Sequence, residues 1–140
     1  MYQWLKRNGY ARQYEHAGIY QITIDGAVAY IGKSTDMLWR LSQHCSAMKL
    51  SKSHKYQVLR EAKKQGHTVT FSVLYYARSK LKTDIVNEIG AAEGEYIRNL
   101  RPPLNEQIPC AADWHKYEYN PTAAVAKLED ILDRSLNNRI

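Results

Sequence analysis

The sequence has little of what marks secreted or membrane proteins. It contains two cysteines, Cys45 and Cys110, in 140 residues, which are too few for a disulfide framework. No stretch approaches the roughly 20 consecutive apolar residues that a membrane-spanning helix needs. The first seven residues lead into no apolar run of the kind found in signal peptides. We therefore expect a cytoplasmic protein with no membrane partner.

Repeats and low-complexity linkers are also missing, so residues 1–140 are expected to form a single domain. A hydrophobic content of 44% argues against disorder. Lys and Arg number 20 against 14 Asp and Glu, and the formal net charge is +6. An excess of positive charge suits a polyanionic partner, because cationic side chains release counterions from phosphates. A solvated basic surface has the same composition, so charge alone does not identify the partner.

Two short runs with β-strand composition flank an Asp-Gly pair near the N-terminus. They cover residues 18–24 and 27–32. Asp-Gly between such runs is a strong signal for a β-hairpin, because both residues tolerate positive φ angles. The hairpin would carry Tyr20 on its first strand and Tyr30 on its second, with Lys33 directly after.

The length of the hairpin loop decides whether the two phenols share one face of the sheet. A two-residue loop, Asp25-Gly26, would pair Tyr20 with Ile31 and place the two tyrosines on opposite faces. A three-residue loop that begins one residue earlier would place Tyr20 opposite Tyr30 on the same face. An active site that uses both phenols favours the three-residue loop, whereas the two-residue loop gives a cleaner apolar face.

A helix is predicted over 36–48, with Ser34 or Thr35 as its N-cap. Arg40 and His44 lie one turn apart and therefore on one face of this helix. They flank a buried stripe formed by Met37, Leu38, Leu41, Cys45 and Met48. Without the hairpin upstream, they would be interpreted as a solvated arginine and a half-buried histidine.

The rest of the chain predicts further regular elements: a basic helix over 51–65, a strand over 68–76 and a helix over 83–100. On the last of these, Glu93 lies at the border of the apolar stripe, whereas Glu88 and Glu95 are expected to be solvated. The predicted fold class is α+β, with a small three-stranded, mostly antiparallel sheet flanked by helices.

The tail beyond Asn105 contains a mixed aromatic and basic segment at 114–117. Such a segment suits either a nucleic-acid contact or docking onto the domain. Asn120-Pro121 is expected to open a C-terminal helix that covers the domain.

Several of these positions resemble the signature of the GIY-YIG nuclease family. In chain order they are Gly18-Ile19-Tyr20, Tyr30-Ile31-Gly32, Arg40, Glu93 and Asn105. Each triplet alone is a weak signal, but their order and spacing with the arginine, glutamate and asparagine make the match specific. The resemblance covers a core of residues 17–105 and leaves 106–140 as a C-terminal extension.

The resemblance implies a metal-dependent DNA endonuclease that hydrolyses phosphodiester bonds. The implied catalytic residues are Tyr20, Tyr30, Lys33, Arg40, His44 and Glu93. The implied nucleic-acid contacts are Lys33, Arg40 and Asn105, with hydrogen bonding that holds the site as the alternative role of Asn105. Glu93 would hold one Mg²⁺ or Mn²⁺, with water and phosphate oxygens completing the coordination.

In this implied mechanism Tyr20 takes the proton of the attacking nucleophile. An unperturbed phenol has a pKa of about 10, so nearby cations, with Lys33 and Arg40 as candidates, would have to lower it. His44 would accept the proton of Tyr20 or act as the base itself. Tyr30 is expected to position other groups.

Two other interpretations remain open from the sequence. The first is a nucleic-acid-binding module of the same fold without catalysis. The second is a zinc site made by His44, Cys45, Cys110 and His115, although these residues lack the usual ligand spacing. The expected partner is DNA, duplex or branched, and the absence of an added DNA-reading domain suggests a small phage-like nuclease. The oligomeric state stays open.

Overall fold

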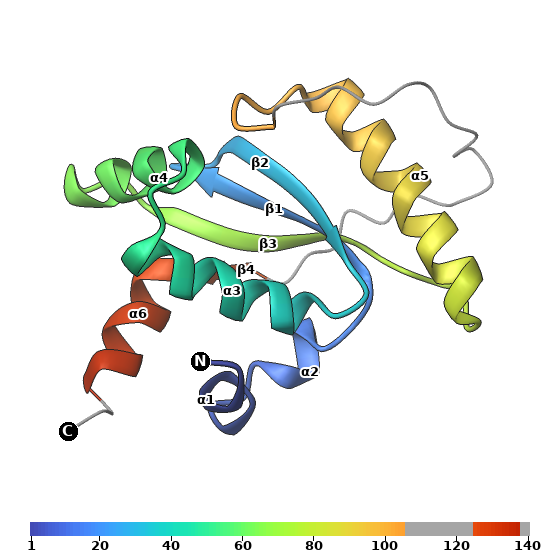
Figure 1. The fold of residues 1–140 in the computed structure, drawn as a ribbon, viewed down its shortest axis with the longest axis horizontal. Coiled ribbons are helices and arrows are strands. Elements are labelled where there is room, and N and C mark those ends of the chain that lie inside the picture. The colour runs from blue at the N-terminus through green and yellow to red at the C-terminus, as the bar shows by residue number, and fades with distance from the viewer. Residues whose placement is uncertain (106–124, 138–140) are drawn as a thin grey trace.

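In the computed structural model, helices cover both faces of a four-stranded antiparallel sheet (Figure 1). The structure describes residues 1–105 and 125–137. The strands are β1 (Gly18–Ile24), β2 (Ala27–Ser34), β3 (Val69–Tyr76) and β4 (Val125–Lys127), in the spatial order β2-β1-β3-β4. The helices are α1 (Tyr2–Arg7), α2 (Ala11–Tyr14), α3 (Met37–Leu50), α4 (His54–Lys64), α5 (Lys82–Leu100) and α6 (Leu128–Asn137).

The predicted α+β class and the antiparallel sheet are confirmed, but the predicted number of three strands is wrong. The fourth strand, β4, pairs with Thr70, Phe71 and Ser72 of β3. A strand of three residues is too short to show an alternating pattern, which explains why the sequence did not predict it. Helix α6 follows directly, whereas Asn120-Pro121 and residues 114–117 lie outside the described part of the chain.

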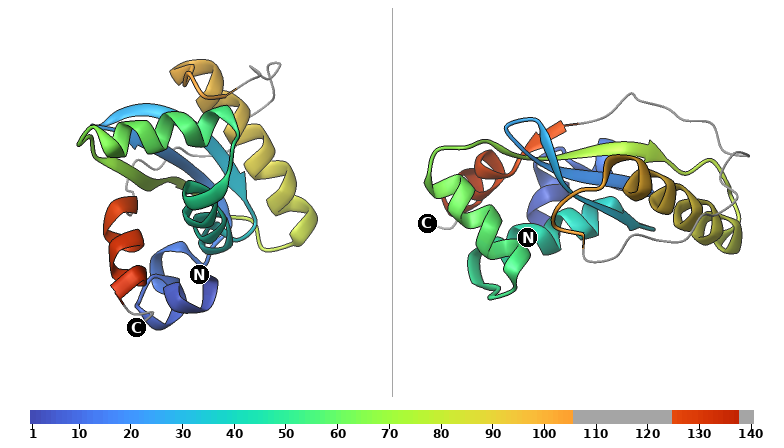
Figure 2. Two further views of the ribbon diagram at one scale, coloured as in Figure 1. Left: turned by 60° about the vertical axis from the view of Figure 1, so that its left-hand side comes forward. Right: turned by 90° about the horizontal axis from the view of Figure 1, so that it is seen from above.

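The sheet separates two apolar clusters, one on each face. The ribbon views in Figure 2 show α5, in yellow and gold, on the other side of the sheet from α6, in red. On the first face, Tyr20, Ile22 and Phe71 pack against side chains of α3, α4 and α6. On the second face, Ile19 and Tyr75 pack against α5. This division follows from the period of two along each strand. Among the described residues, no helix combines the length and apolarity needed to cross a bilayer.

The β1–β2 hairpin has a two-residue loop, so the predicted three-residue loop is wrong. Asp25 and Gly26 have φ angles of 50° and 83°, the positive pair that a tight hairpin turn requires. Next to the turn, Ile24 pairs with Ala27 and Thr23 with Val28.

An irregularity after this point changes the register of the hairpin. Ile22 pairs with Tyr30, and Tyr20 pairs with Gly32, so Ala29 is an extra residue in β2. A bulge of one residue reverses which side chains of a strand face each side of the sheet. Tyr20 and Tyr30 therefore share a face, as a site that uses both requires, but because of this bulge and not because of the loop.

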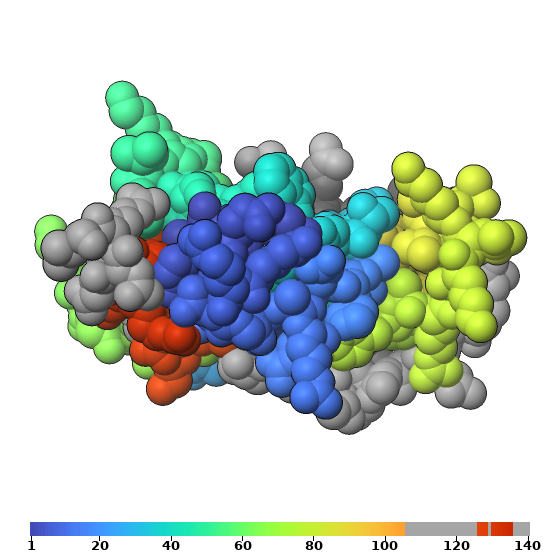
Figure 3. Space-filling view, turned by 90° about the horizontal axis from the view of Figure 1, so that it is seen from below, coloured from blue at the N-terminus to red at the C-terminus, as the bar shows by residue number. Residues whose placement is uncertain are grey.

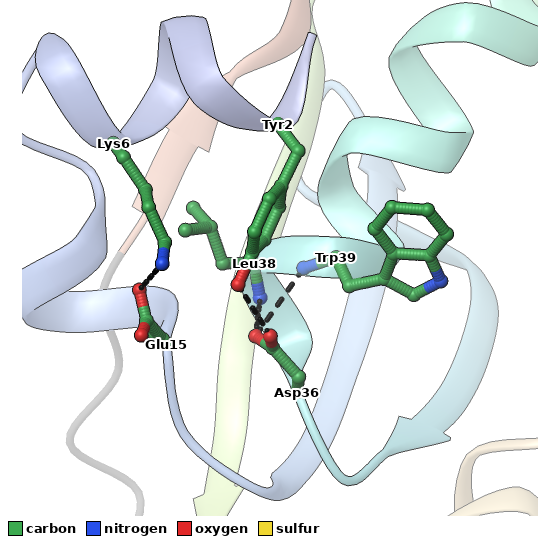
Figure 4. A network of polar contacts seen from close by, with 6 residues as sticks. All are labelled: Tyr2, Lys6, Glu15, Asp36, Leu38 and Trp39. Atoms are coloured by element: carbon green, nitrogen blue, oxygen red, sulfur yellow. Dashed lines mark hydrogen bonds and ion pairs between the residues drawn. The ribbon is translucent and has the colours of Figure 1, made fainter.

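Helix α3 is capped by Asp36 and not by the predicted Ser34 or Thr35 (Figure 4). Asp36 Oδ1 accepts hydrogen bonds from the backbone N–H groups of Leu38 at 3.0 Å and Trp39 at 3.3 Å. The hydroxyl of Tyr2 donates to Asp36 Oδ2 at 2.7 Å. One carboxylate thus satisfies two otherwise unpaired donors at the start of α3 and ties α1 to the same point.

The N-terminal helices pack on α3 and beside α6. Gly9, with a φ of 88°, separates α1 from α2 and prevents one longer helix. Figure 3 shows the first residues, in dark blue, next to the red residues of α6. Arg134 of α6 donates to the Tyr10 hydroxyl at 3.0 Å. The C-terminal helix therefore covers the domain, as expected.

Glu88 on α5 is buried, so the prediction that it is solvated is wrong. Its carboxylate accepts hydrogen bonds from the Tyr75 hydroxyl and from the backbone N–H groups of Arg78 and Ser79. These donors compensate the loss of hydration. Together they hold the pKa of Glu88 below its usual value, although burial alone acts to raise it.

Asn105 closes the outer edge of β2. Its side-chain oxygen accepts from the backbone N–H of Ile31 at 2.9 Å, and its side-chain nitrogen donates to the carbonyl of Ile31 at 2.8 Å. The backbone N–H of Leu104 also donates to the carbonyl of Ala29 at 2.9 Å. The segment after α5 is thereby fixed along an edge strand whose polar groups would otherwise be unpaired.

Candidate active site

The residues singled out from the sequence lie around β2, which contacts both α3 and α5 (Figure 1). The rings of Tyr20 and Tyr30 have centroids 6.3 Å apart at 44°. Tyr20 is fully buried and stacks on Phe71 with a centroid distance of 4.6 Å. A Cβ atom added at Gly32 would overlap the ring and hydroxyl of Tyr20. The glycine of the second triplet is therefore the surface on which the tyrosine of the first triplet rests.

His44 of α3 lies between two tyrosine hydroxyls. Its Nε2 is 2.8 Å from the Tyr20 hydroxyl, and its Nδ1 is 2.7 Å from the Tyr56 hydroxyl of α4. The imidazole is fully buried. Burial, followed by the charges of Lys55 and Arg40, holds the pKa of His44 well below its ordinary value. The imidazole is therefore neutral at neutral pH and can accept a proton.

Tyr20 is a protonated phenol in this structure. Burial raises its pKa above the ordinary range, and the neighbouring Tyr30 adds to the effect. The charge of Arg40 opposes the rise. The predicted lowering of the Tyr20 pKa is therefore wrong for the protein alone, because removal from water outweighs the nearby cation.

Arg40 reaches this cluster from the same face of α3 as His44. Its guanidinium donates to the side-chain oxygen of Gln43 at 2.6 Å. Its charge also lowers the pKa of Tyr30, which burial raises more strongly. A half-buried arginine with one N–H bound to Gln43 keeps further donors for a phosphate.

Glu93 on α5 faces the cationic side of the site. Its carboxylate lies 4.0 Å from Lys33 Nζ. Burial raises the pKa of Glu93, while the charges of Lys33 and Arg40 lower it. Glu95, two positions along, pairs instead with Arg98 at 2.7 Å. The structure thus brings Glu93, and not Glu95, to the residues of β2 and α3. The charge of Lys33 lowers the pKa of Glu93, whereas the cation that lowers the pKa of Tyr20 is Arg40.

Sequence reasoning missed three residues that contact the site. Tyr56 binds His44, Gln43 binds Arg40, and Lys55 Nζ lies 4.0 Å from the centre of the Tyr30 ring. In sequence, Tyr56 falls on the apolar stripe of α4 with Leu59, so packing alone explains it. Only its distance from His44 in space distinguishes it from a core residue.

Glu93 fits the prediction of a divalent metal held by a single carboxylate. The Lys33–Glu93 pair is longer than a hydrogen bond, so the carboxylate oxygens keep lone pairs for a hard cation. Within the described residues, no group of three or more His, Cys, Asp or Glu side chains could hold a metal ion. Water and phosphate oxygens would have to supply the other ligands.

The zinc site left open by the sequence finds no support in the residues that are described. Both ring nitrogens of His44 already have hydrogen-bond partners. Burial raises the pKa of the Cys45 thiol to about 12, which disfavours the thiolate that zinc binds. Cys110 and His115 lie outside the described part of the chain.

The comparisons with known proteins give matches among solved structures. No protein-family model and no curated protein sequence matches this chain. Among solved structures, a variant of EndoII from bacteriophage T4, a GIY-YIG endonuclease, matches with a TM-score of 0.53 and 24% sequence identity. The match covers 64% of this chain and 74% of the EndoII chain. The chain therefore has the fold of the GIY-YIG endonucleases, as its two signature triplets predict.

Proposed function

We propose that this protein is a metal-dependent DNA endonuclease that hydrolyses phosphodiester bonds. The observation that carries the proposal is the 2.8 Å hydrogen bond between the Tyr20 hydroxyl and the neutral His44. This pair can move a proton. The charge of Arg40 acts on both Tyr20 and Glu93, and these residues supply the donors and the carboxylate that phosphodiester cleavage needs. The fold shared with T4 EndoII supports the same class of reaction.

Tyr20 acts as the base by exchanging protons and not as a preformed phenolate. Because burial keeps Tyr20 protonated, it can accept the proton of water only while giving its own proton to His44. His44 is suited to receive it, because it is neutral and its Nε2 already lies within hydrogen-bond distance. Arg40 binds the phosphate through its donor fork.

Glu93 is the proposed ligand of Mg²⁺ or Mn²⁺. A divalent ion bound there would neutralise negative charge that develops on the phosphate and the departing oxygen. Lys33 faces the same carboxylate and adds positive charge where the phosphate would lie. Tyr30, beneath Lys55, keeps its proposed positioning role.

The proposed substrate is DNA, either duplex or branched. The net charge of +6 favours a polyanion. Asn105 was predicted as a nucleic-acid contact or as a residue that holds the site. Since both polar atoms of its side chain bind Ile31, we favour the holding role. The likeness to T4 EndoII favours a phage-type nuclease.

A cleavage assay with a matched pair of variants tests the proposal. The protein is incubated with linear, nicked, flapped, four-way and single-stranded DNA and with RNA, each with and without Mg²⁺. Glu93→Gln should abolish Mg²⁺-supported cutting and leave DNA affinity nearly unchanged, because affinity rests on many phosphate contacts. Glu95→Gln, which alters a glutamate paired with Arg98 on the same helix, should cut normally.

Two outcomes would contradict the proposal. If the unaltered protein binds these DNAs but cuts none of them with either metal, it is a binding module of the same fold. If Glu95→Gln loses activity and Glu93→Gln keeps it, the carboxylate is wrongly assigned.

A further inference from the structure

Two tyrosine hydroxyls approach His44 from opposite sides, and only one of them belongs to the signature triplets. The Tyr20 hydroxyl oxygen is 2.8 Å from His44 Nε2, and the Tyr56 hydroxyl oxygen is 2.7 Å from His44 Nδ1. A neutral imidazole carries one N–H and one bare nitrogen. One hydroxyl must therefore donate to the ring while the other accepts from it, and the tautomer of His44 decides which.

The tautomer matters for the proposed reaction. If Nδ1 carries the hydrogen, Nε2 is bare and accepts the hydrogen of Tyr20. If Nε2 carries the hydrogen, it donates to Tyr20, and Tyr20 has no acceptor on His44 for its own proton. Only the first tautomer lets Tyr20 take a proton from water while passing one on.

The surroundings of the two hydroxyls favour the first tautomer. The charge of Arg40 lowers the pKa of the Tyr20 hydroxyl against the effect of burial, which favours Tyr20 as the donor to His44. Tyr20 is fully buried in the protein without DNA, and the acceptor that lies at its hydroxyl is His44 Nε2, at 2.8 Å. Tyr56 is partly exposed, so its own hydrogen can go to water while its oxygen accepts from His44. The second tautomer would take the acceptor away from a buried hydroxyl hydrogen, which costs free energy.

We propose that Tyr56 is a positioning residue that accepts the Nδ1 hydrogen of His44 and so keeps Nε2 bare for the proton of Tyr20. The catalytic part of this inference rests on the proposed nuclease function, whereas the tautomer is a property of the free protein.

The protons balance along this path. Water loses one proton to the Tyr20 oxygen as its own oxygen bonds to phosphorus, and the Tyr20 proton moves to His44 Nε2. The bond from phosphorus to the departing oxygen breaks with its electron pair on that oxygen, which takes a proton from solvent. His44 is then an imidazolium that still donates from Nδ1 to Tyr56. After the product leaves, the proton returns from Nε2 through Tyr20 to solvent, and the starting tautomer is restored.

The first experiment measures the His44 tautomer by ¹⁵N NMR of the imidazole in the full chain without DNA. Tyr56→Phe removes one oxygen and keeps the ring. In the unaltered protein we expect the hydrogen on Nδ1. In Tyr56→Phe the ratio of the Nδ1–H to the Nε2–H form should fall, because a buried Nδ1–H left without an acceptor costs more free energy than a bare Nδ1 left without a donor. Tyr76→Phe, which removes a hydroxyl bound to the carbonyl of Gln13, should leave the ratio unchanged.

The second experiment measures cleavage. Tyr56→Phe should lower kcat by about tenfold and leave the KM for DNA unchanged, because it alters the proton acceptor and not a phosphate contact. Tyr76→Phe should match the unaltered protein.

The two experiments separate failure of this inference from failure of the proposed function. An Nε2–H form in the unaltered protein, or an unchanged tautomer ratio in Tyr56→Phe, overturns the role of Tyr56 whatever the activity. A protein that cuts no DNA overturns the nuclease function but leaves the tautomer result standing. A change in KM without a change in kcat would place Tyr56 in DNA binding instead.

Discussion

At the scale of single residues, the site depends on a contact between the two signature triplets. Tyr20 lies over Gly32, where any side chain would occupy the volume of the phenol ring. The ring is also fixed from the other side by Phe71. A tyrosine held between a glycine and a phenylalanine has one position, and in that position its hydroxyl meets His44.

Gly32→Ala should therefore displace the Tyr20 hydroxyl from His44 and reduce cleavage strongly, because the added methyl overlaps the ring. The measurement is kcat, together with the NMR signal of the His44 side chain. Gly90→Ala is the control, since its added Cβ would lie 3.7 Å from Lys33 Nζ, an ordinary contact. Normal activity of Gly32→Ala would mean that the position of the ring does not matter.

Tyr20→Phe removes the proposed base and keeps the packing on Phe71 and Gly32. General-base catalysis contributes about 10²–10⁴-fold, so kcat should fall by an amount in that range while the melting temperature changes little. Near-normal cleavage by this variant would leave His44 as the direct base.

Lys33→Met should move the acid limb of the pH–rate profile to higher pH. The charge of Lys33 lowers the pKa of Glu93, which burial raises. Without Lys33 the pKa of Glu93 rises further, so the carboxylate becomes available to a metal only at higher pH. Lys82→Met, at an exposed lysine that begins α5, should leave the limb in place. An unchanged limb in Lys33→Met would mean that Glu93 does not set it.

At the scale of elements, α3 carries Arg40, Gln43 and His44, and its first turn depends on Asp36. The Asp36 carboxylate binds two backbone donors of α3 and the Tyr2 hydroxyl of α1. One residue outside the site thus fixes the start of the helix on which the site is built.

Asp36→Ala should lower the free energy of unfolding by about 1 kcal/mol, the usual value of a side-chain N-cap, and more if α1 detaches. Chemical denaturation measures the difference. Ser53→Ala is the matched control, because Ser53 is the N-cap of α4 but makes no side-chain capping bond there. Equal losses in the two variants would contradict the role of the Asp36 carboxylate.

The elements that could be predicted from sequence are those with strong local patterns. The Asp-Gly turn, the alternation in β3 and the apolar stripe of α3 each fix an element without knowledge of the rest. The bulge at Ala29, the strand β4 and the burial of Glu88 depend on partners distant in sequence. Tyr56 belongs to the same group, because nothing local separates a tyrosine that binds a histidine from one that fills a core.

At the scale of the whole molecule, the site is part of the hydrophobic core and not only of the surface. His44 packs among Tyr20, Tyr30, Tyr56 and Phe71. Folding therefore has to bury a neutral imidazole, and the stability of the protein becomes linked to the protonation of His44.

The stability should fall as the pH drops below about 6.5, the pKa of an unfolded histidine. In the folded state the pKa of His44 is lower, so between the two values the unfolded chain binds one more proton than the folded protein. One such proton changes the unfolding free energy by about 1.4 kcal/mol per pH unit. His44→Gln should flatten this slope, measured by denaturation at several pH values, whereas the exposed His54→Gln should not. An equal slope in all three proteins would contradict the burial of a neutral His44.

The amide of Asn105 has a consequence for how copies of this protein can associate. It hydrogen-bonds both the N–H and the carbonyl of Ile31, as a residue of a neighbouring strand would. The backbone N–H of Leu104 donates to the carbonyl of Ala29. The edge of β2 is thus already terminated by a single side chain acting in place of a fifth strand. Two molecules cannot form one continuous sheet by pairing their β2 strands unless the hydrogen bonds between Asn105 and Ile31 first break.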